Sequence, residues 1–235
     1  MARSGVEGMR LMEHSRPLAL DPFGGRQPTS HERMTGQPWD ASYRAGPAPW
    51  DVGRPQPAVV RLAGAGGFAG AVLDAGCGTG ENALHLASRG LPVMGVDVAP
   101  TAVAIARAKA RDRGIEVEFA VADAFELARL GRRFESVLDS GLFHTFAGDE
   151  RPRYVASLAA ATQPGGTLHV VCFSDAAPAT GPHPVSEAEL RAAFAPGTGW
   201  AVAAVVPDRI QTRFHADGAP AWVATITRSP GEPAN

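Results

Sequence analysis

A turn with a glycine at every second position places the strongest constraint on how this chain folds. Gly76, Gly78 and Gly80 follow a short apolar run that ends in an acid, and a helical pattern begins at Glu81. This order of residues predicts a strand, a tight turn and the start of a helix. Glycine adopts a positive φ without a steric penalty and lets the backbone approach a ligand closely. The segment therefore predicts a ligand held at the turn.

The spacing of these glycines indicates which kind of ligand the turn accepts. A dinucleotide-binding turn has the spacing G-x-G-x-x-G, whereas this turn has Glu81 where that third glycine would stand. A pyrophosphate would bind at the helix N-terminus, and a carboxylate there would repel it. We therefore expect a nucleoside ligand without phosphates, with S-adenosylmethionine (SAM) as the first candidate. An NAD-dependent oxidoreductase is the competing interpretation.

A second acid supports an adenosine site. The strand candidate 92–97 ends in Asp97, about 20 residues beyond the glycine turn, where an acid can accept hydrogen bonds from ribose hydroxyls. Because SAM and NAD both carry a ribose, Asp97 does not distinguish between them.

The composition argues against several classes of partner. The 235 residues are 45% hydrophobic and carry a formal net charge of −2, so no basic surface for nucleic acid is expected. The absence of a long apolar run or a signal-peptide pattern predicts no membrane partner and a cytoplasmic location. Cys77 and Cys172 are too few for a disulfide framework, and no histidine spacing predicts a metal. We expect a monomer or a weak dimer.

Strand and helix patterns alternate through most of the chain. Strand candidates are 71–75, 92–97, 116–121, 134–139, 167–173, 201–206 and 221–227, and helix candidates are 59–63, 81–89, 100–113, 151–162 and 186–194. Short connections between alternating elements predict an α/β fold with a doubly wound, mostly parallel sheet of seven strands. The last two strands have no helix pattern between them, so they are expected to form an antiparallel pair.

The glycine turn, Asp97 and Asp123 together resemble the class I SAM-dependent methyltransferases over roughly residues 68–175. In that family the loop glycines contact the methionine part of SAM, and acids after the second and third strands bind the ribose and the adenine. The resemblance implies a Rossmann-like fold with an antiparallel edge strand, SAM as cofactor and S-adenosylhomocysteine as product. It assigns cofactor binding here to Asp74, Gly76, Gly78, Gly80, Asp97, Val98, Asp123, Ala124 and Ser140.

Four segments are expected along the chain. Residues 1–35 are rich in Arg, Gly, Pro and Ser without periodicity, which predicts a disordered leader. Residues 36–66 are predicted to form an N-terminal arm or lid, residues 67–229 the methyltransferase domain, and residues 230–235 a disordered tail.

The arm carries two tryptophans within restricted, proline-rich sequence. Trp39 and Trp50 have large apolar side chains, for which buried positions are favourable. In a lid over the cofactor they would also contact the sulfonium, since the face of an aromatic ring attracts a cation. Plain packing of the arm against the sheet is the alternative. The segment 49–57 looks like the P-W-D-x-G-x-x-x-P lead-in of the thiol and halide methyltransferases, relatives of the thiopurine enzymes. A late loop, Ser174–Asp175 followed by 181–186, is similar to that group as well.

His144 is the candidate catalytic residue. It follows the fourth strand candidate, and its ordinary pKa lies near the working pH, so it could take a proton from the acceptor. The alternative is a histidine packed between Phe143 and Phe146. His183 in the late loop could face the acceptor, although a solvated position is the simpler expectation.

These observations predict methyl transfer by in-line displacement to a small molecule. A thiol, a halide or a heteroaromatic S, N or O nucleophile is the favoured acceptor. O- or N-methylation of a phenolic or quinone-type metabolite is the alternative, and a non-catalytic SAM-binding module is a further one.

Overall fold

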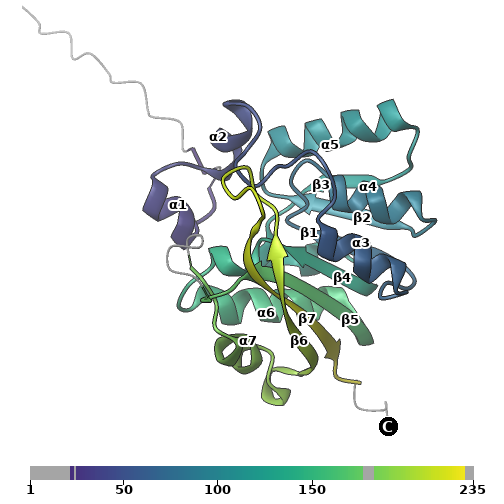
Figure 1. Ribbon diagram of the computed structural model, residues 1–235, viewed down its shortest axis with the longest axis vertical. Coiled ribbons are helices and arrows are strands. Elements are labelled where there is room, and N and C mark those ends of the chain that lie inside the picture. The colour runs from purple at the N-terminus through teal and green to yellow at the C-terminus, as the bar shows by residue number, and fades with distance from the viewer. Residues whose placement is uncertain (1–21, 24, 177–182, 231–235) are drawn as a thin grey trace, which may run out of the picture.

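The computed structural model describes residues 22–23, 25–176 and 183–230. Within them seven strands form one sheet in the order β3-β2-β1-β4-β5-β7-β6 (Figure 1). The strands are β1 (Val72–Ala75), β2 (Val93–Asp97), β3 (Glu118–Val121), β4 (Phe134–Ser140), β5 (Thr162–Phe173), β6 (Trp200–Ile210) and β7 (Ala219–Arg228). The first five are parallel, and β7 is antiparallel to both β5 and β6 at one end of the sheet. The predicted fold class is confirmed.

Helices form where the sequence supplies periodicity and end signals. They are α1 (Ser30–Thr35), α2 (Trp39–Arg44), α3 (Pro57–Gly64), α4 (Glu81–Ser88), α5 (Pro100–Arg113), α6 (Glu150–Ala161) and α7 (Glu187–Ala193), with 3-10 helices η1 (Ala124–Leu130), η2 (Phe143–Thr145) and η3 (Pro196–Thr198). Proline in the first turn and left-handed Gly114 after the end bound α5 as predicted. No helix in the described ranges has the length and apolar character needed to cross a membrane.

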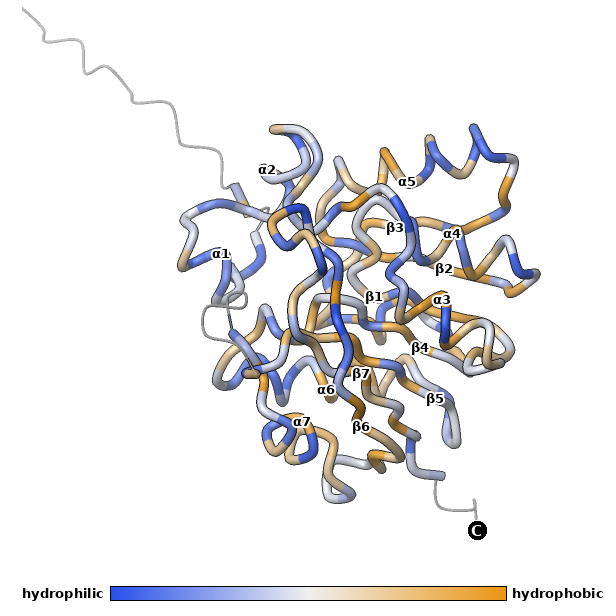
Figure 2. Tube along the Cα trace, in the orientation of Figure 1, coloured by the Kyte–Doolittle hydropathy of each residue, from blue (hydrophilic) through white to orange (hydrophobic). Residues whose placement is uncertain are grey.

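Helices cover both faces of the sheet, and each face has its own core (Figure 1). On one face α3, α4 and α5 pack against residues such as Val72 and Leu138, which are fully buried. On the other face η1, α6 and α7 pack against Leu73 and Val137. Consecutive residues of one strand therefore serve opposite cores, as strand geometry requires. Figure 2 shows the apolar residues gathered along the central strands.

The arm begins earlier than the sequence indicated. Residues 1–21 and 24 of the predicted leader lie outside the described residues, but residues 30–35 form α1, which starts with a capping box between Thr29 and Glu32. Ser30 Oγ donates to Glu150 Oε2 of α6 at 2.6 Å. The structure therefore places a helix inside the segment that the sequence analysis assigned to the leader, and a contact with a residue 120 positions away, which local composition does not reveal, helps to hold it.

Candidate active site

A cavity of about 580 Å³ opens at the carboxyl ends of the parallel strands. This is the edge of an open α/β sheet where ligands bind, because the connections diverge to opposite faces there. The predicted cofactor residues that line it are Gly76, Gly78, Gly80, Asp97, Val98, Asp123, Ala124, Ser140, Trp39 and Trp50. The structure thus brings ten of the eleven predicted cofactor-binding residues into one cavity.

Asp97 holds the glycine turn in shape. Its Oδ2 accepts a hydrogen bond from Gly78 N at 2.8 Å, and its Oδ1 accepts one from Ala99 N at 2.9 Å. Burial raises the pKa of this carboxyl despite those bonds. Two backbone bonds leave lone pairs free on a carboxylate, which has room for about four, so Asp97 can still accept from two ribose hydroxyls.

The glycines of the turn are needed for space as well as for backbone conformation. Gly80 has φ +85°, and a Cβ there would lie 2.8 Å from Phe119 Cζ and 2.9 Å from Ala106 Cβ. A Cβ on Gly76 would lie 2.8 Å from Leu142 Cδ2. Side chains at these two positions would clash with the packed interior, so the turn can follow this path only with glycine.

The far end of the cofactor side lies after β3. Asp123 caps η1 through a 2.9 Å bond from Phe125 N to its Oδ1, which again leaves acceptor capacity toward the cavity. Ser140 Oγ is buried and has no partner among the described residues. An orphaned hydroxyl in the cavity wall fits a bound ligand, because buried polar atoms are otherwise paired. These features suit the ribose, adenine and amino-acid groups of SAM.

Asp74 is the predicted cofactor residue that the structure places elsewhere. It lies beneath the turn, is almost fully buried and does not line the cavity. Burial, with Asp97 nearby, raises its pKa to about 7. Asp139 on β4 pairs with Ala75, so it points to the opposite face of the sheet from Asp74, and there it accepts a 2.9 Å bond from Tyr154 Oη. Asp139 Oδ1 also accepts bonds from Leu142 N and Phe143 N, so this acid shapes the turn that follows β4.

The arm covers the cavity with aromatic side chains. Trp39 and Tyr43 of α2 line it together with Trp50, whose Nε1 donates to Tyr43 Oη at 2.9 Å. His31 of α1 stacks on Trp39 with ring centroids 4.4 Å apart. Asp51 of the P-W-D segment accepts a 2.8 Å bond from Thr79 Oγ1 in the glycine turn. The arm is therefore bonded to the turn that it covers.

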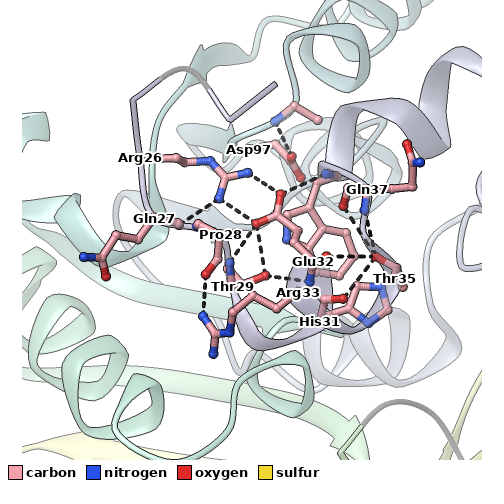
Figure 3. Close-up of polar contacts among 12 residues, drawn as sticks. Arg26, Gln27, Pro28, Thr29, His31, Glu32, Arg33, Thr35, Gln37 and Asp97 are labelled. Carbon is pink, nitrogen blue, oxygen red and sulfur yellow. Dashed lines mark hydrogen bonds and ion pairs between the residues drawn. The ribbon is translucent and has the colours of Figure 1, made fainter. Parts of the chain in front are cut away.

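Glu32 connects the two arm helices (Figure 3). Its buried carboxylate accepts bonds from Arg26, from Thr29 N at 2.9 Å and from Trp39 N at 3.0 Å. Burial alone would raise its pKa, but these donors lower the pKa below its ordinary value. At the other end of the arm, Asp40 Oδ1 accepts from Thr101 N of α5 at 2.7 Å. The arm is thus bonded to α6 through Ser30 and to α5 through Asp40.

Glu81 does not act as the free charge that the sequence argument assumed. Lys109 Nζ lies 2.9 Å from its Oε1, and Arg113 binds both carboxylate oxygens at 2.8 Å. Burial tends to raise the pKa of Glu81, but bonds from these two cations bring it below its ordinary value. A neutralised carboxylate cannot exclude a pyrophosphate by repulsion alone. The choice between SAM and NAD must rest on other observations.

His144 lines the cavity but is not placed as a general base. Its Nδ1 accepts a 3.2 Å bond from Phe173 N, and its ring lies 4.1 Å from the Phe173 ring between centroids. Burial, together with the nearby His31, Arg151 and His183, lowers its pKa to about 3. The nitrogen that would take a proton is already occupied, which argues against the predicted role. His183 is half-buried near this site, whereas Gly181 and Pro182 of its loop lie outside the described residues.

Sequence reasoning missed the β6–β7 loop and part of the arm. The additional lining residues there include Thr29, His31, Gln56, Ile210, Gln211, Thr212, Phe214 and His215. The Gln56 side chain bonds the backbone of Gln211 twice, at 2.9 Å and 2.8 Å. The exposed position of Phe214, 77% accessible, was not readable from the sequence, since an aromatic residue after a strand usually predicts burial.

No group of three or more His, Cys, Asp or Glu side chains in the described part of the chain is placed to hold a metal ion.

A family model described as a methyltransferase domain matches residues 72–166. A 2-heptyl-1-hydroxyquinolin-4(1H)-one methyltransferase of Mycobacteroides abscessus is 42% identical over 164 residues, which are 65% of this chain and 72% of that protein.

Solved structures agree with the sequence relatives. One, described under "Conversion of a Disulfide Bond into a Thioacetal Group during Echinomycin Biosynthesis", has 39% identity and a TM-score of 0.73, covering 81% of this chain and 91% of its own. Magnesium protoporphyrin IX methyltransferase from Synechocystis, solved with bound SAM, has 25% identity and a TM-score of 0.57, covering 73% and 76%. This chain belongs to the class I SAM-dependent methyltransferases and is an enzyme that uses SAM to methylate a small molecule.

Proposed function

We propose that the acceptor is a flat heteroaromatic molecule that is methylated on an acidic hydroxyl or ring nitrogen. The observation that carries this proposal is the character of the acceptor side of the cavity. Its lining includes the large apolar side chains Trp39, Phe173, Ile210 and Phe214, with polar side chains such as His144 among them. Planar apolar walls of this kind suit an aromatic ring system, because rings stack on aromatic faces over a large contact area.

The ten residues assigned to the cofactor would hold SAM with its methyl group toward these walls. Asp97 and Asp123 would accept from the ribose and the adenine, and Ser140 would meet the amino-acid part. Trp39 and Trp50 would cover the sulfonium, as the aromatic arm over the glycine turn suggests. SAM supplies an activated methyl group, so the protein contributes position. In-line placement of the nucleophile can supply about 7–11 kcal/mol.

The relative from Mycobacteroides abscessus supports a hydroxylated nitrogen heterocycle, since its name describes such an acceptor. This shifts the balance toward the O- or N-methylation that the sequence analysis held as the alternative. A thiol remains the second candidate, because the solved structure with 39% identity is described under sulfur chemistry. A halide acceptor rests only on the resemblance of segment 49–57 and of the late loop after β5 to the thiol and halide group.

An acceptor panel tests the proposal. A 1-hydroxyquinolin-4(1H)-one, benzenethiol, phenol, quinoline and iodide are each offered with SAM, and release of S-adenosylhomocysteine is measured. We expect the hydroxyquinolone to give the highest kcat/KM and benzenethiol the next. Turnover with iodide alone would overturn the acceptor class and favour the halide group. Binding of SAM by calorimetry without turnover on any acceptor would favour a non-catalytic module.

A further inference from the structure

His144 takes the place of a strand carbonyl at the open end of the sheet. The last pair between β4 and β5 joins Ser140 and Val171, and Gly141 N donates to Val171 O at 2.8 Å. Phe173 lies two residues further along β5, so its amide points toward the same side as that of Val171. With β4 ended, that amide would lack a partner. His144 Nδ1 accepts it instead, at 3.2 Å.

This bond fixes the tautomer of His144. A backbone amide can only donate, so Nδ1 must present its lone pair, and the neutral ring then carries its hydrogen on Nε2. The stacking against Phe173 restrains the plane of the ring. Nε2 forms no hydrogen bond with any residue in the described ranges, and it is not one of the fully buried atoms that lack a partner. It is therefore the edge of the ring that His144 presents to the cavity it lines.

The surroundings of His144 favour its neutral form. Burial disfavours a charged His144 ring. Three basic side chains nearby also disfavour a positive charge on it, namely His31 of α1, Arg151 of α6 and His183 before α7. Protonation of Nδ1 would also turn the Phe173 bond into a contact between two hydrogens. A proton taken from the acceptor would have to enter this unfavourable position, so the geometry itself opposes general-base catalysis here.

We propose, building on the function above, that His144 binds the acceptor as a fixed Nε2–H donor, and that the enzyme methylates only acceptors that are nucleophilic without its help. The donor bonds an oxygen or nitrogen lone pair of the acceptor. The acceptor anion then forms a bond to the methyl carbon while the carbon–sulfur bond breaks, and its electron pair goes to sulfur. No proton moves in this step. The substrate class is therefore acidic heteroaromatic hydroxyls and thiols, ionised near neutral pH.

Two variants separate the donor from the base. In His144→Asn the amide oxygen lies near the Nδ1 position and can still accept from Phe173 N, but no donor reaches the acceptor. In His144→Gln an N–H reaches the Nε2 position. We expect kcat/KM for the acceptor to fall at least tenfold in the Asn variant, since a hydrogen bond to a charged group contributes about 1.5–3 kcal/mol. The Gln variant should recover most of this loss, with SAM affinity unchanged in both.

Equal loss in both variants would overturn the donor role, provided that melting temperatures show both to be folded. Nitrogen NMR of histidine-labelled protein gives a readout that does not depend on activity or on the acceptor. We expect the His144 signal to keep its hydrogen on Nε2 from about pH 8 to about pH 5. A hydrogen on Nδ1, or a titration near neutral pH, would refute the proposal.

The pH dependence of turnover tests the substrate class. With a phenol that carries electron-withdrawing groups, the rate should follow ionisation of the phenol itself, and unsubstituted phenol should be a poor acceptor at neutral pH. Efficient methylation of unsubstituted phenol at pH 7 would show that the enzyme supplies a base. If no acceptor turns over while NMR still shows the Nε2 hydrogen, the proposed function fails and the tautomer assignment stands.

Discussion

The cofactor side and the acceptor side of the cavity are built in different ways. Most of the residues assigned to the cofactor lie in turns that directly follow β1, β2 and β3, and Asp97 bonds the glycine turn that it faces. The acceptor side is assembled from the arm, η2, the end of β5 and the β6–β7 loop, which are far apart in sequence. Local sequence therefore specifies most of the cofactor side, whereas the acceptor side depends on contacts between segments that are far apart in the chain.

This difference indicates how each side can change. A substitution in the glycine turn meets packed neighbours at once, as the 2.8 Å approach of a Cβ on Gly80 to Phe119 shows. The β6–β7 loop carries Phe214 exposed at the cavity wall, where replacement disturbs no core. We expect acceptor choice to vary among relatives while the cofactor site does not, because loops tolerate change better than the elements that position them.

The largest effect is expected at Asp97, and it should be confined to the cofactor. Asp97→Ala removes two backbone bonds to a carboxylate and the acceptor atoms for the ribose, so SAM affinity should fall about 100-fold, or about 3 kcal/mol. Calorimetric titration of both proteins with SAM measures this change in affinity. Asp112→Ala, an exposed acid on α5, is the control. An unchanged affinity would remove Asp97 from the cofactor side.

Glycine substitutions test whether the cofactor turn is fixed by packing. Gly80→Ala and Gly90→Ala place a side chain at φ +85° and φ +87°, but Gly90 has open space around it. The backbone strain is matched, so the difference reports the clash with Phe119 and Ala106. We expect Gly80→Ala to lower the free energy of unfolding by about 2 kcal/mol more than Gly90→Ala, measured by urea denaturation. Equal losses would mean that the turn can shift.

On the acceptor side, His144 should make stability depend on pH. Burial lowers its pKa to about 3 in the folded protein, against about 6.5 when unfolded. The unfolded chain then binds the proton first, so stability is lost as pH falls below about 6.5. Between pH 7 and pH 5.5 this loss is about 1.3 kcal/mol.

His144→Asn, which cannot titrate, should remove that part of the slope. The raised pKa values of Asp74 and Asp139 act in the opposite direction in both proteins and cancel in the difference. Urea denaturation of both proteins at the two pH values makes the measurement. Parallel pH profiles would show that His144 is not held neutral.

The smallest effect is expected where the two sides meet. Tyr43 Oη accepts the Trp50 Nε1 hydrogen bond and lies over the glycine turn, 3.1 Å from where a Cβ on Gly78 would be. Tyr43→Phe should weaken SAM about fivefold, or about 1 kcal/mol, because the arm closes less firmly. Trp50→Phe removes the same bond from its other end. A double variant with the sum of both losses would show that this bond does not hold the arm.

The parts of the molecule that were predictable depend on local signals. Pro100 and Gly114 bound α5, and the glycine turn and Asp97 line one cavity as the sequence indicated, because turn chemistry and alternation act within a few residues. Ala124 and Ser140 were found through the resemblance, not through any physical signal of their own. Asp74 does not line the cavity, and the sequence could not show this, because it places an acid near the end of the strand without showing to which side the acid points.

The parts that were not predictable depend on distant partners. Glu81 is neutralised by Lys109 and Arg113, which reach it from α5. The role of His144 is set by an amide of β5, 29 residues further along the chain. Composition assigned Glu32 to a disordered leader, yet its carboxylate is fully buried. In each case the sequence showed the residue itself but not the distant residue with which it interacts.

The bonds of Glu32 to both arm helices bear on how the enzyme exchanges spent cofactor for fresh. Because the Glu32 carboxylate accepts from Thr29 N at the start of α1 and from Trp39 N at the start of α2, movement of one helix breaks a buried bond unless the other follows. If S-adenosylhomocysteine leaves on the side that the arm covers, we expect the two arm helices to lift together. The frequency of that lifting would set an upper limit on the rate at which the enzyme cycles, whatever acceptor it is given.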